Sequence, residues 1–163
     1  MGMGRGLVLA LLLATAGCAS GGHGHTHGDS QVVPTHEKDH AQHLVLKGPK
    51  KTQGIAAVVN LASLVLAREF KELQGRQLRV RELTIAPGGV VAVHQHQRRP
   101  GVAYIIEGEM VEHRSGAKAP IVHKAGSVAV EYTGVSHWWE NASSRPARAL
   151  VIDIVPLTPS KTK

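Results

Sequence analysis

The chain has 163 residues, a formal net charge of +7 at pH 7 and a single cysteine. This length allows one domain with appendages, and a lone cysteine excludes an internal disulfide. The lysines lie mainly at 47–51 and at the C-terminus, and the scattered arginines form neither a basic helix nor an alternation with aromatic residues. We therefore expect a soluble basic surface and no binding of nucleic acid.

Residues 1–17 predict an export signal peptide. Arg5 precedes an apolar run over 7–13 that is too short to span a bilayer, and small residues follow. Thr15-Ala16-Gly17-Cys18 resembles a bacterial lipobox, which implies cleavage before Cys18 and lipidation of that residue. Ala19 in place of Asp implies the outer rather than the inner membrane. We expect a lipid-anchored envelope protein on the periplasmic side; the alternative is a plain signal peptide with a free thiol.

Residues 18–46 predict a flexible, histidine-rich tether, because no apolar periodicity runs through them. Such a tract is either a polar spacer or an accessory metal tract, since neutral imidazole suits Zn, Cu and Ni. Its histidines are His23, His25, His27, His36, His40 and His43.

The remaining chain predicts an all-β domain. We expect a lead-in with an edge strand over 47–77, in which 55–70 could instead form a short helix, a barrel core over 78–156 and a disordered basic tail over 157–163. Short apolar runs separated by Gly and Pro indicate a sandwich or barrel. Pro87-Gly88-Gly89 is expected to separate two strands, and hairpins are expected at 107–108 and 115–116.

Three histidines in the core predict a metal site. His94 and His96 lie two residues apart in an expected strand, so they project from one face. His137 follows a glycine turn and supplies a third imidazole from another strand. Trp139 and Asn141 share its face by alternation.

The spacing of these residues resembles the two motifs of the cupin superfamily. Gly88, five residues, His94-x-His96 and a later Gly108 match the first motif; Gly126, Gly134, His137 and Asn141 match the second, with Tyr132 replacing its Pro. The resemblance implies a double-stranded β-helix, a jelly-roll barrel, that holds one divalent metal with His94, His96, His137 and a Glu. Gly101 stands where the first motif carries that Glu.

The missing Glu leaves three interpretations. The site has three histidines and an open position, as in Zn sites and as the resemblance to some cupin dioxygenases implies for Fe(II). Alternatively, another residue replaces the Glu, or the barrel binds its ligand without metal. The candidates for a replacement are Glu112 and His113, which face opposite ways, and His123.

We therefore predict a metalloprotein that acts on a small organic molecule, with Fe(II), Zn, Mn or Ni as its metal. Fe(II) would suit dioxygenase chemistry, whereas Zn or Mn would suit hydrolysis or isomerisation. The alternatives are a binding module without turnover and a structural envelope protein; a homodimer is compatible with each. Candidate general bases are Glu112, Glu131 and Tyr132, and the expected substrate pocket comprises Arg98, Arg99, Tyr104, Tyr132, Trp139 and Asn141.

Overall fold

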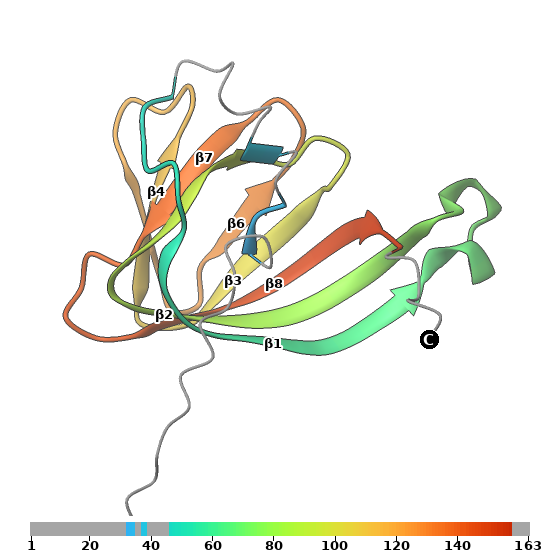
Figure 1. Ribbon diagram of the computed structural model, residues 1–163, viewed down its shortest axis with the longest axis horizontal. Coiled ribbons are helices and arrows are strands. Elements are labelled where there is room, and N and C mark those ends of the chain that lie inside the picture. Colours follow the sequence, from blue (N-terminus) through green and yellow to red (C-terminus); the bar gives the residue numbers. More distant parts are fainter. Residues whose placement is uncertain (1–31, 35–36, 39–45, 158–163) are drawn as a thin grey trace, which may run out of the picture.

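The computed structural model describes residues 32–34, 37–38 and 46–157 (Figure 1). No helix in these ranges is long and apolar enough to cross a membrane. The elements, in chain order, are β1 (Gln53–Val65), η1 (Leu66–Arg68), η2 (Lys71–Leu73), β2 (Arg76–Gln95), β3 (Gly101–Glu107), β4 (Glu109–Arg114), β5 (Ile121–Lys124), β6 (Val128–Glu131), β7 (Ser136–Glu140) and β8 (Ala147–Pro156).

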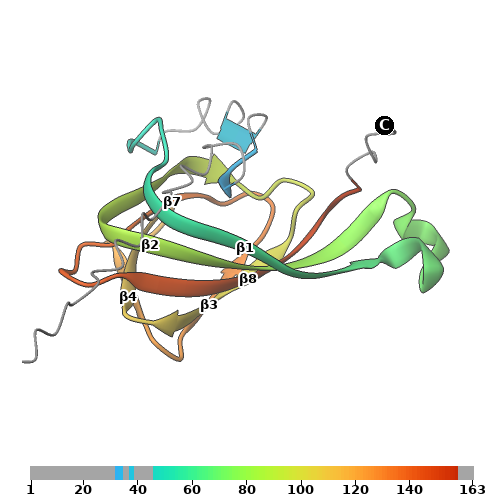
Figure 2. The ribbon, with the colours of Figure 1, turned by 60° about the horizontal axis from the view of Figure 1, so that its bottom comes forward.

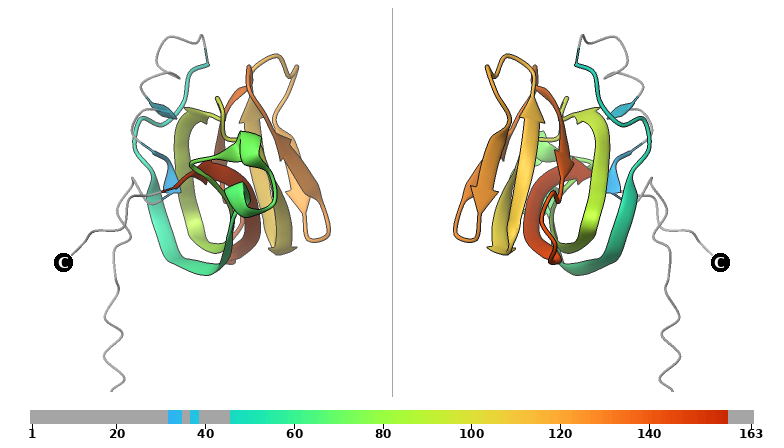
Figure 3. Two further views of the ribbon diagram at one scale, coloured as in Figure 1. Left: turned by 90° about the vertical axis from the view of Figure 1, so that its right-hand side faces the viewer. Right: turned by 90° about the vertical axis from the view of Figure 1, so that its left-hand side faces the viewer.

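The strands form one curled antiparallel sheet in the order β5-β4-β7-β2-β8-β3-β6, with β1 added to β2. Figure 3 shows how the sheet bends round on itself into a nearly closed barrel. This arrangement confirms the predicted all-β jelly-roll barrel. In β8, burial alternates strictly, so that Ala147, Ala149 and Val151 face the core, together with Asp153. The core thus arises from the two-residue period of the strands.

The segment Pro87-Gly88-Gly89 bends a strand instead of separating two, so the predicted boundary is wrong. β2 runs through it, pairing with β8 over 76–85 and with β7 over 90–95. Gly88 has a φ of +70°, and a Cβ on Gly89 would lie 2.8 Å from the Gly54 carbonyl oxygen. The glycines let one long strand change partners at a barrel corner, and this bend carries His94 to the barrel interior.

The hairpin expected at 107–108 is also wrong, whereas the one at 115–116 is confirmed by the pairing of β4 with β5. β3 pairs with β6 and β8, and β4 pairs with β5 and β7, so the chain crosses between different parts of the sheet at Gly108. Gly108 has a φ of +74°, and an added Cβ would lie 2.9 Å from the Pro146 carbonyl oxygen. A glycine there marks a tight crossing.

The β1–β2 hairpin extends beyond the barrel as an arm that ends in η1 and η2 (Figures 1 and 2). In Figure 2, β1, β2 and β8 lie side by side, in agreement with their pairing. Four large apolar side chains on the arm are about half exposed: Val59, Leu61, Leu64 and Phe70.

Residues 32–34 and 37–38, here called the N-terminal strap, pack against the barrel (blue in Figure 1). Val32 and Val33 are buried and belong to the same apolar cluster as Leu83 and Ile85. The expectation of a flexible tether over 18–46 therefore does not hold for the strap. Two adjacent valines produce no periodicity, so the sequence pattern could not reveal this packing.

Candidate metal centre

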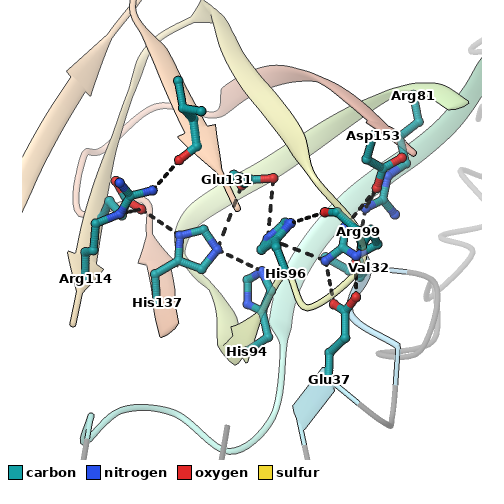
Figure 4. Close-up of polar contacts among 12 residues, drawn as sticks. Val32, Glu37, Arg81, His94, His96, Arg99, Arg114, Glu131, His137 and Asp153 are labelled. Atoms are coloured by element: carbon teal, nitrogen blue, oxygen red, sulfur yellow. Dashed lines mark hydrogen bonds and ion pairs between the residues drawn. The ribbon is translucent and has the colours of Figure 1, made fainter. Parts of the chain in front are cut away.

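Three buried imidazoles converge inside the barrel (Figure 4). His94 on β2 is the register partner of His137 on β7, and His96 directly follows β2. The Nε2 atoms of His94 and His137 are 3.1 Å apart. One ring nitrogen from each of the three residues lies within 4.8 Å of the others, which is a spacing that could hold one metal ion. The structure thus brings together the histidines of both sequence motifs.

The Nδ1 atom of each ring is held from behind by an oxygen acceptor. Nδ1 of His94 lies 2.8 Å from the Ala92 carbonyl oxygen, and Nδ1 of His96 lies 3.1 Å from that of Arg99. Nδ1 of His137 lies 2.6 Å from a carboxylate oxygen of Glu112. Because these acceptors take the proton of Nδ1, Nε2 of each ring in its neutral form carries the lone pair, and it faces the other two rings.

The surroundings keep the imidazoles of His94 and His96 neutral. Burial lowers the pKa of His94 well below its ordinary 6.5, and His137 and His96 act in the same direction. Burial, followed by the positive charge of Arg99, lowers the pKa of His96 to about 2. Neutral imidazole is the form that ligates a metal, so protons do not compete with a metal for His94 and His96 near neutral pH.

Glu131, at the end of β6, faces the same centre. Its Oε2 is 3.4 Å from Nε2 of His96, and its Oε1 is 3.9 Å from Nε2 of His137. Burial raises the pKa of its carboxyl group. Its Oε2 is buried and has no hydrogen-bond partner within the described ranges. An orphaned carboxylate oxygen beside three imidazole lone pairs fits a divalent cation, so the residues present suit the implied metal.

The register of Glu131 places it opposite the position of the missing motif Glu. Gly101, on β3, is the register partner of Glu131. A Cβ on Gly101 would lie 2.7 Å from the Ile152 carbonyl oxygen and 2.9 Å from Cβ of Asp153, so a side chain there would clash. A carboxylate faces the histidines from the adjacent strand, at Glu131. From the sequence, Glu131 was predicted only as a general base.

The three residues proposed as replacements for the motif Glu do not face the centre. Glu112 is buried behind His137, where burial would raise its pKa but hydrogen bonding to His137 and the charge of Arg114 lower it. Nε2 of His123 lies 3.0 Å from the other oxygen of Glu112. His113 stacks on Trp138 and hydrogen-bonds to Glu140, outside the cavity. Glu112 therefore orients the His137 ring, and His123 contacts Glu112 from the other side.

Two of the six predicted pocket residues line a cavity of about 50 Å³ next to the histidines: Arg99 and Trp139. Asn141 is buried elsewhere, where its amide donates to the carbonyl oxygens of Ile85 and Arg145. Arg98, Tyr104 and Tyr132 are exposed and do not line the cavity. Their prediction as pocket residues, which rested on strand alternation and on proximity in the sequence, is wrong.

A cluster of arginines around Asp153 forms the other side of the site. Arg79 makes two hydrogen bonds to the Asp153 carboxylate, at 3.0 and 2.7 Å, and Nη1 of Arg99 donates to it at 2.8 Å. Arg81 lies 3.7 Å from the same carboxylate, and burial, followed by the charge of Arg79, lowers its pKa to about 10. This cluster was not predicted from the sequence, although Arg79 and Arg81 alternate on one strand.

Cys18, predicted to carry the lipid, and the predicted accessory metal tract lie outside the described residues. The tract comprises His23, His25, His27, His36, His40 and His43.

Residues 81–153 match the family model of the cupin domain, which supports membership of the cupin superfamily for the barrel. Over 73 residues the chain is 34% identical to an oxalate-binding protein of Thermotoga maritima, covering 45% of this chain and 59% of that protein. A solved structure of a protein from Thermus thermophilus shares 23% identity, with a TM-score of 0.48 and coverage of 71% and 92%. An oxalate oxidase in complex with glycolate shares 23% identity, with a TM-score of 0.46 and coverage of 63% and 54%.

Proposed function

We propose that this protein binds one divalent metal ion through His94, His96, His137 and Glu131, and that a small organic ligand binds beside this ion in the cavity. The observation that carries the proposal is the convergence of three buried ring nitrogens within 4.8 Å of one another. Three imidazoles and one carboxylate suit Mn, Fe(II), Zn and Ni, so the donor set does not select among them. When bound, the metal would act as a Lewis acid on ligand oxygens.

The chain's own residues prepare the site for such a ligand. Glu112 fixes the orientation of His137 through Nδ1, and Arg99 presents a guanidinium whose Nη2 is 3.5 Å from Nε2 of His96. A guanidinium binds a carboxylate through two parallel hydrogen bonds. The name of the Thermotoga relative, an oxalate-binding protein, also supports a small carboxylate as ligand.

The apolar side chains in the cavity wall favour a second candidate, which is turnover of the bound molecule. Trp139, Met110 and Leu83 form part of its wall, so a bound molecule would lie against apolar side chains. The reaction would be that of a metal-dependent oxidoreductase or isomerase. Carbon-13 NMR of labelled oxalate with the metal-loaded protein, with and without O₂, tests this candidate; unchanged spectra would leave binding as the function.

The proposed location is the periplasmic side of the cell envelope, with a lipid on Cys18 as the anchor. The lipobox-like Thr15-Ala16-Gly17-Cys18 supports it. We expect the wild-type protein to enter the detergent phase in Triton X-114 partitioning and Cys18→Ser to stay in the aqueous phase, because a lipid chain supplies the apolar surface. Equal partitioning of both proteins would refute the anchor.

Titration calorimetry of the metal-free full-length chain with Mn(II) and with Zn(II) tests the metal site. We expect one tight site in the wild type that His94→Ala weakens at least a hundredfold. His113→Ala is the matched control, since His113 is a partly buried histidine that stacks on Trp138 outside the cavity. Equal loss in both variants would contradict the assignment. Weak binding by the tether histidines would remain in all three proteins.

A further inference from the structure

The N-terminal strap places a carboxylate into the arginine cluster. Glu37 is buried, and its two oxygens accept from Nε and Nη2 of Arg99 in a bidentate pair (Figure 4). The carbonyl oxygen of Val32 accepts from Nη2 of Arg81 at 3.2 Å. The strap therefore contacts the barrel through the same side chains that line the cavity.

The charges around Arg99 favour an anion at the edge of its guanidinium formed by Nε and Nη2. Three arginines surround the single carboxylate of Asp153, which already engages Arg79 and Nη1 of Arg99. Glu37 accepts from the remaining edge of the Arg99 guanidinium. Burial would lower the pKa of Arg99, but Glu37 and Asp153 outweigh burial and raise it. Without Glu37, a buried guanidinium edge would lose its partner, which is costly unless another anion replaces it.

The same edge of Arg99 is next to the proposed metal. Its Nη2 is hydrogen-bonded to Glu37 and is also 3.5 Å from Nε2 of His96. A carboxylate held by Arg99 thus lies beside the metal-binding face of a histidine. The cavity of about 50 Å³ has Val32 in its wall. Since one water needs roughly 10–15 Å³, the space suits a compact molecule of a few heavy atoms.

We propose that Glu37 is an internal competitor that occupies a carboxylate-binding site on Arg99, and that a small carboxylate displaces it and releases the strap. The inference rests on the proposed function, because it assigns the ligand class and the regulation of that same site. Only molecules in which Glu37 has left Arg99 can bind an external carboxylate. The apparent affinity is therefore the intrinsic affinity multiplied by the fraction of such molecules. Removing the Glu37 carboxylate should remove this competition.

The first test measures oxalate binding by calorimetry on the full-length, chelator-treated chain. We expect Glu37→Gln to bind oxalate at least tenfold more tightly than the wild type. Glu72→Gln is the matched control, because Glu72 is an exposed carboxylate on η2. The gain should vanish in Glu37→Gln/Arg99→Lys, since lysine cannot provide the bidentate fork. Equal affinity of Glu37→Gln and wild type, or an equal gain in the control, would overturn the proposal.

The second test uses the wild type and does not depend on a folded variant. The amides of Glu37 and Lys38 donate to the Pro34 carbonyl oxygen at 3.0 and 3.4 Å. Hydrogen exchange at both amides should accelerate at an oxalate concentration that saturates the protein. Unchanged exchange under saturation would overturn the proposal, because the strap would then stay bound with the ligand present.

Mn(II) titration of the same proteins separates this inference from the proposed function. If the wild type binds Mn(II) tightly and Glu37→Gln gains no oxalate affinity, the proposal on Glu37 fails alone. If Glu37→Gln gains affinity but none of the proteins binds a metal at the histidines, the proposed function fails, whereas the Arg99 site stands without its metal.

Discussion

The two sides of the cavity show opposite solutions to the burial of ionisable groups. On one side, His94 and His96 are buried without an opposite charge strong enough to keep them protonated, so their pKa values fall and they become neutral donors. On the other side, Arg99 is buried just as deeply, yet carboxylates keep it charged. One side is therefore prepared for a cation and the other for an anion.

Both sides draw residues from the same strand and from the turn that follows it. The N-terminal half of β2 carries Arg79 and Arg81, and its C-terminal end leads into His94 and His96. The glycine bend at 88–89 lets this strand pair first with β8 and then with β7. β8 supplies Asp153 to the arginines, whereas β7 supplies His137 to the histidines. The partner strand thus decides whether an interior side chain of β2 meets a carboxylate or another imidazole.

The largest effect on the free energy of unfolding is expected when the arginine cluster loses the charge of Asp153. Asp153→Asn leaves three arginines with fewer acceptors in the interior, and breaking a buried ion pair from one side costs about 3–5 kcal/mol. Urea unfolding of the metal-free protein measures this loss. Glu82→Gln is the control: Glu82 also makes two hydrogen bonds to one arginine, Arg148, but at the surface. Comparable destabilisation of both variants would show that burial is not the cause.

A smaller effect is expected on the neutral side, when a histidine keeps its place but loses its orienting group. Glu112→Gln can still accept from Nδ1 of His137 but removes the negative charge behind it. Loss of such a partner typically weakens metal binding about 10–100-fold. Titration with Zn(II) measures it. Glu140→Gln, which alters the partner of His113 outside the cavity, should leave the affinity unchanged. Unchanged affinity in Glu112→Gln would remove Glu112 from the site.

The smallest expected effect is the dependence of the free energy of unfolding on pH, which also differs between the two sides of the cavity. The folded pKa values of His94 and His96 lie below their ordinary 6.5, so below pH 6.5 the unfolded chain binds protons that the folded protein does not. Stability of the metal-free protein should therefore fall as the pH decreases from 6.5, by about 1.4 kcal/mol per pH unit for each such histidine. The depressed pKa of Asp153 adds to this loss only at more acidic pH.

Unfolding free energies measured between pH 7 and pH 5 give this slope. His94→Gln should reduce the slope by about 1.4 kcal/mol per pH unit, which is the contribution of one proton. A slope that His94→Gln leaves unchanged would mean that His94 is not the neutral, buried group described.

The sequence predicted those parts of the site that depend on local spacing. The His-x-His pair and the later glycine turn before His137 located three converging imidazoles, and the regular Gly and Pro signals indicated the fold class. Glu131 could not be placed beside the histidines, because its position depends on its register with Gly101 across β3 and β6. A motif that scores one strand at a time does not contain that register.

The arginine cluster and the strap escaped prediction for related reasons. Asp153 reaches Arg79 only because β8 pairs with β2, although the two residues are 74 positions apart. Glu37 lies in a polar segment whose composition favours a tether, and its burial depends on a cavity formed by distant strands. Tertiary pairing, rather than local pattern, determines which of these charged residues are internal.

Anomalous diffraction from crystals of the metal-loaded protein, recorded at the absorption edge of the added metal, tests the metal centre most directly. We predict one strong peak about 2.0–2.3 Å from Nε2 of His94, His96 and His137, with a Glu131 oxygen in the same coordination sphere. A peak that is absent from this position in protein shown to contain stoichiometric metal would contradict the central claim.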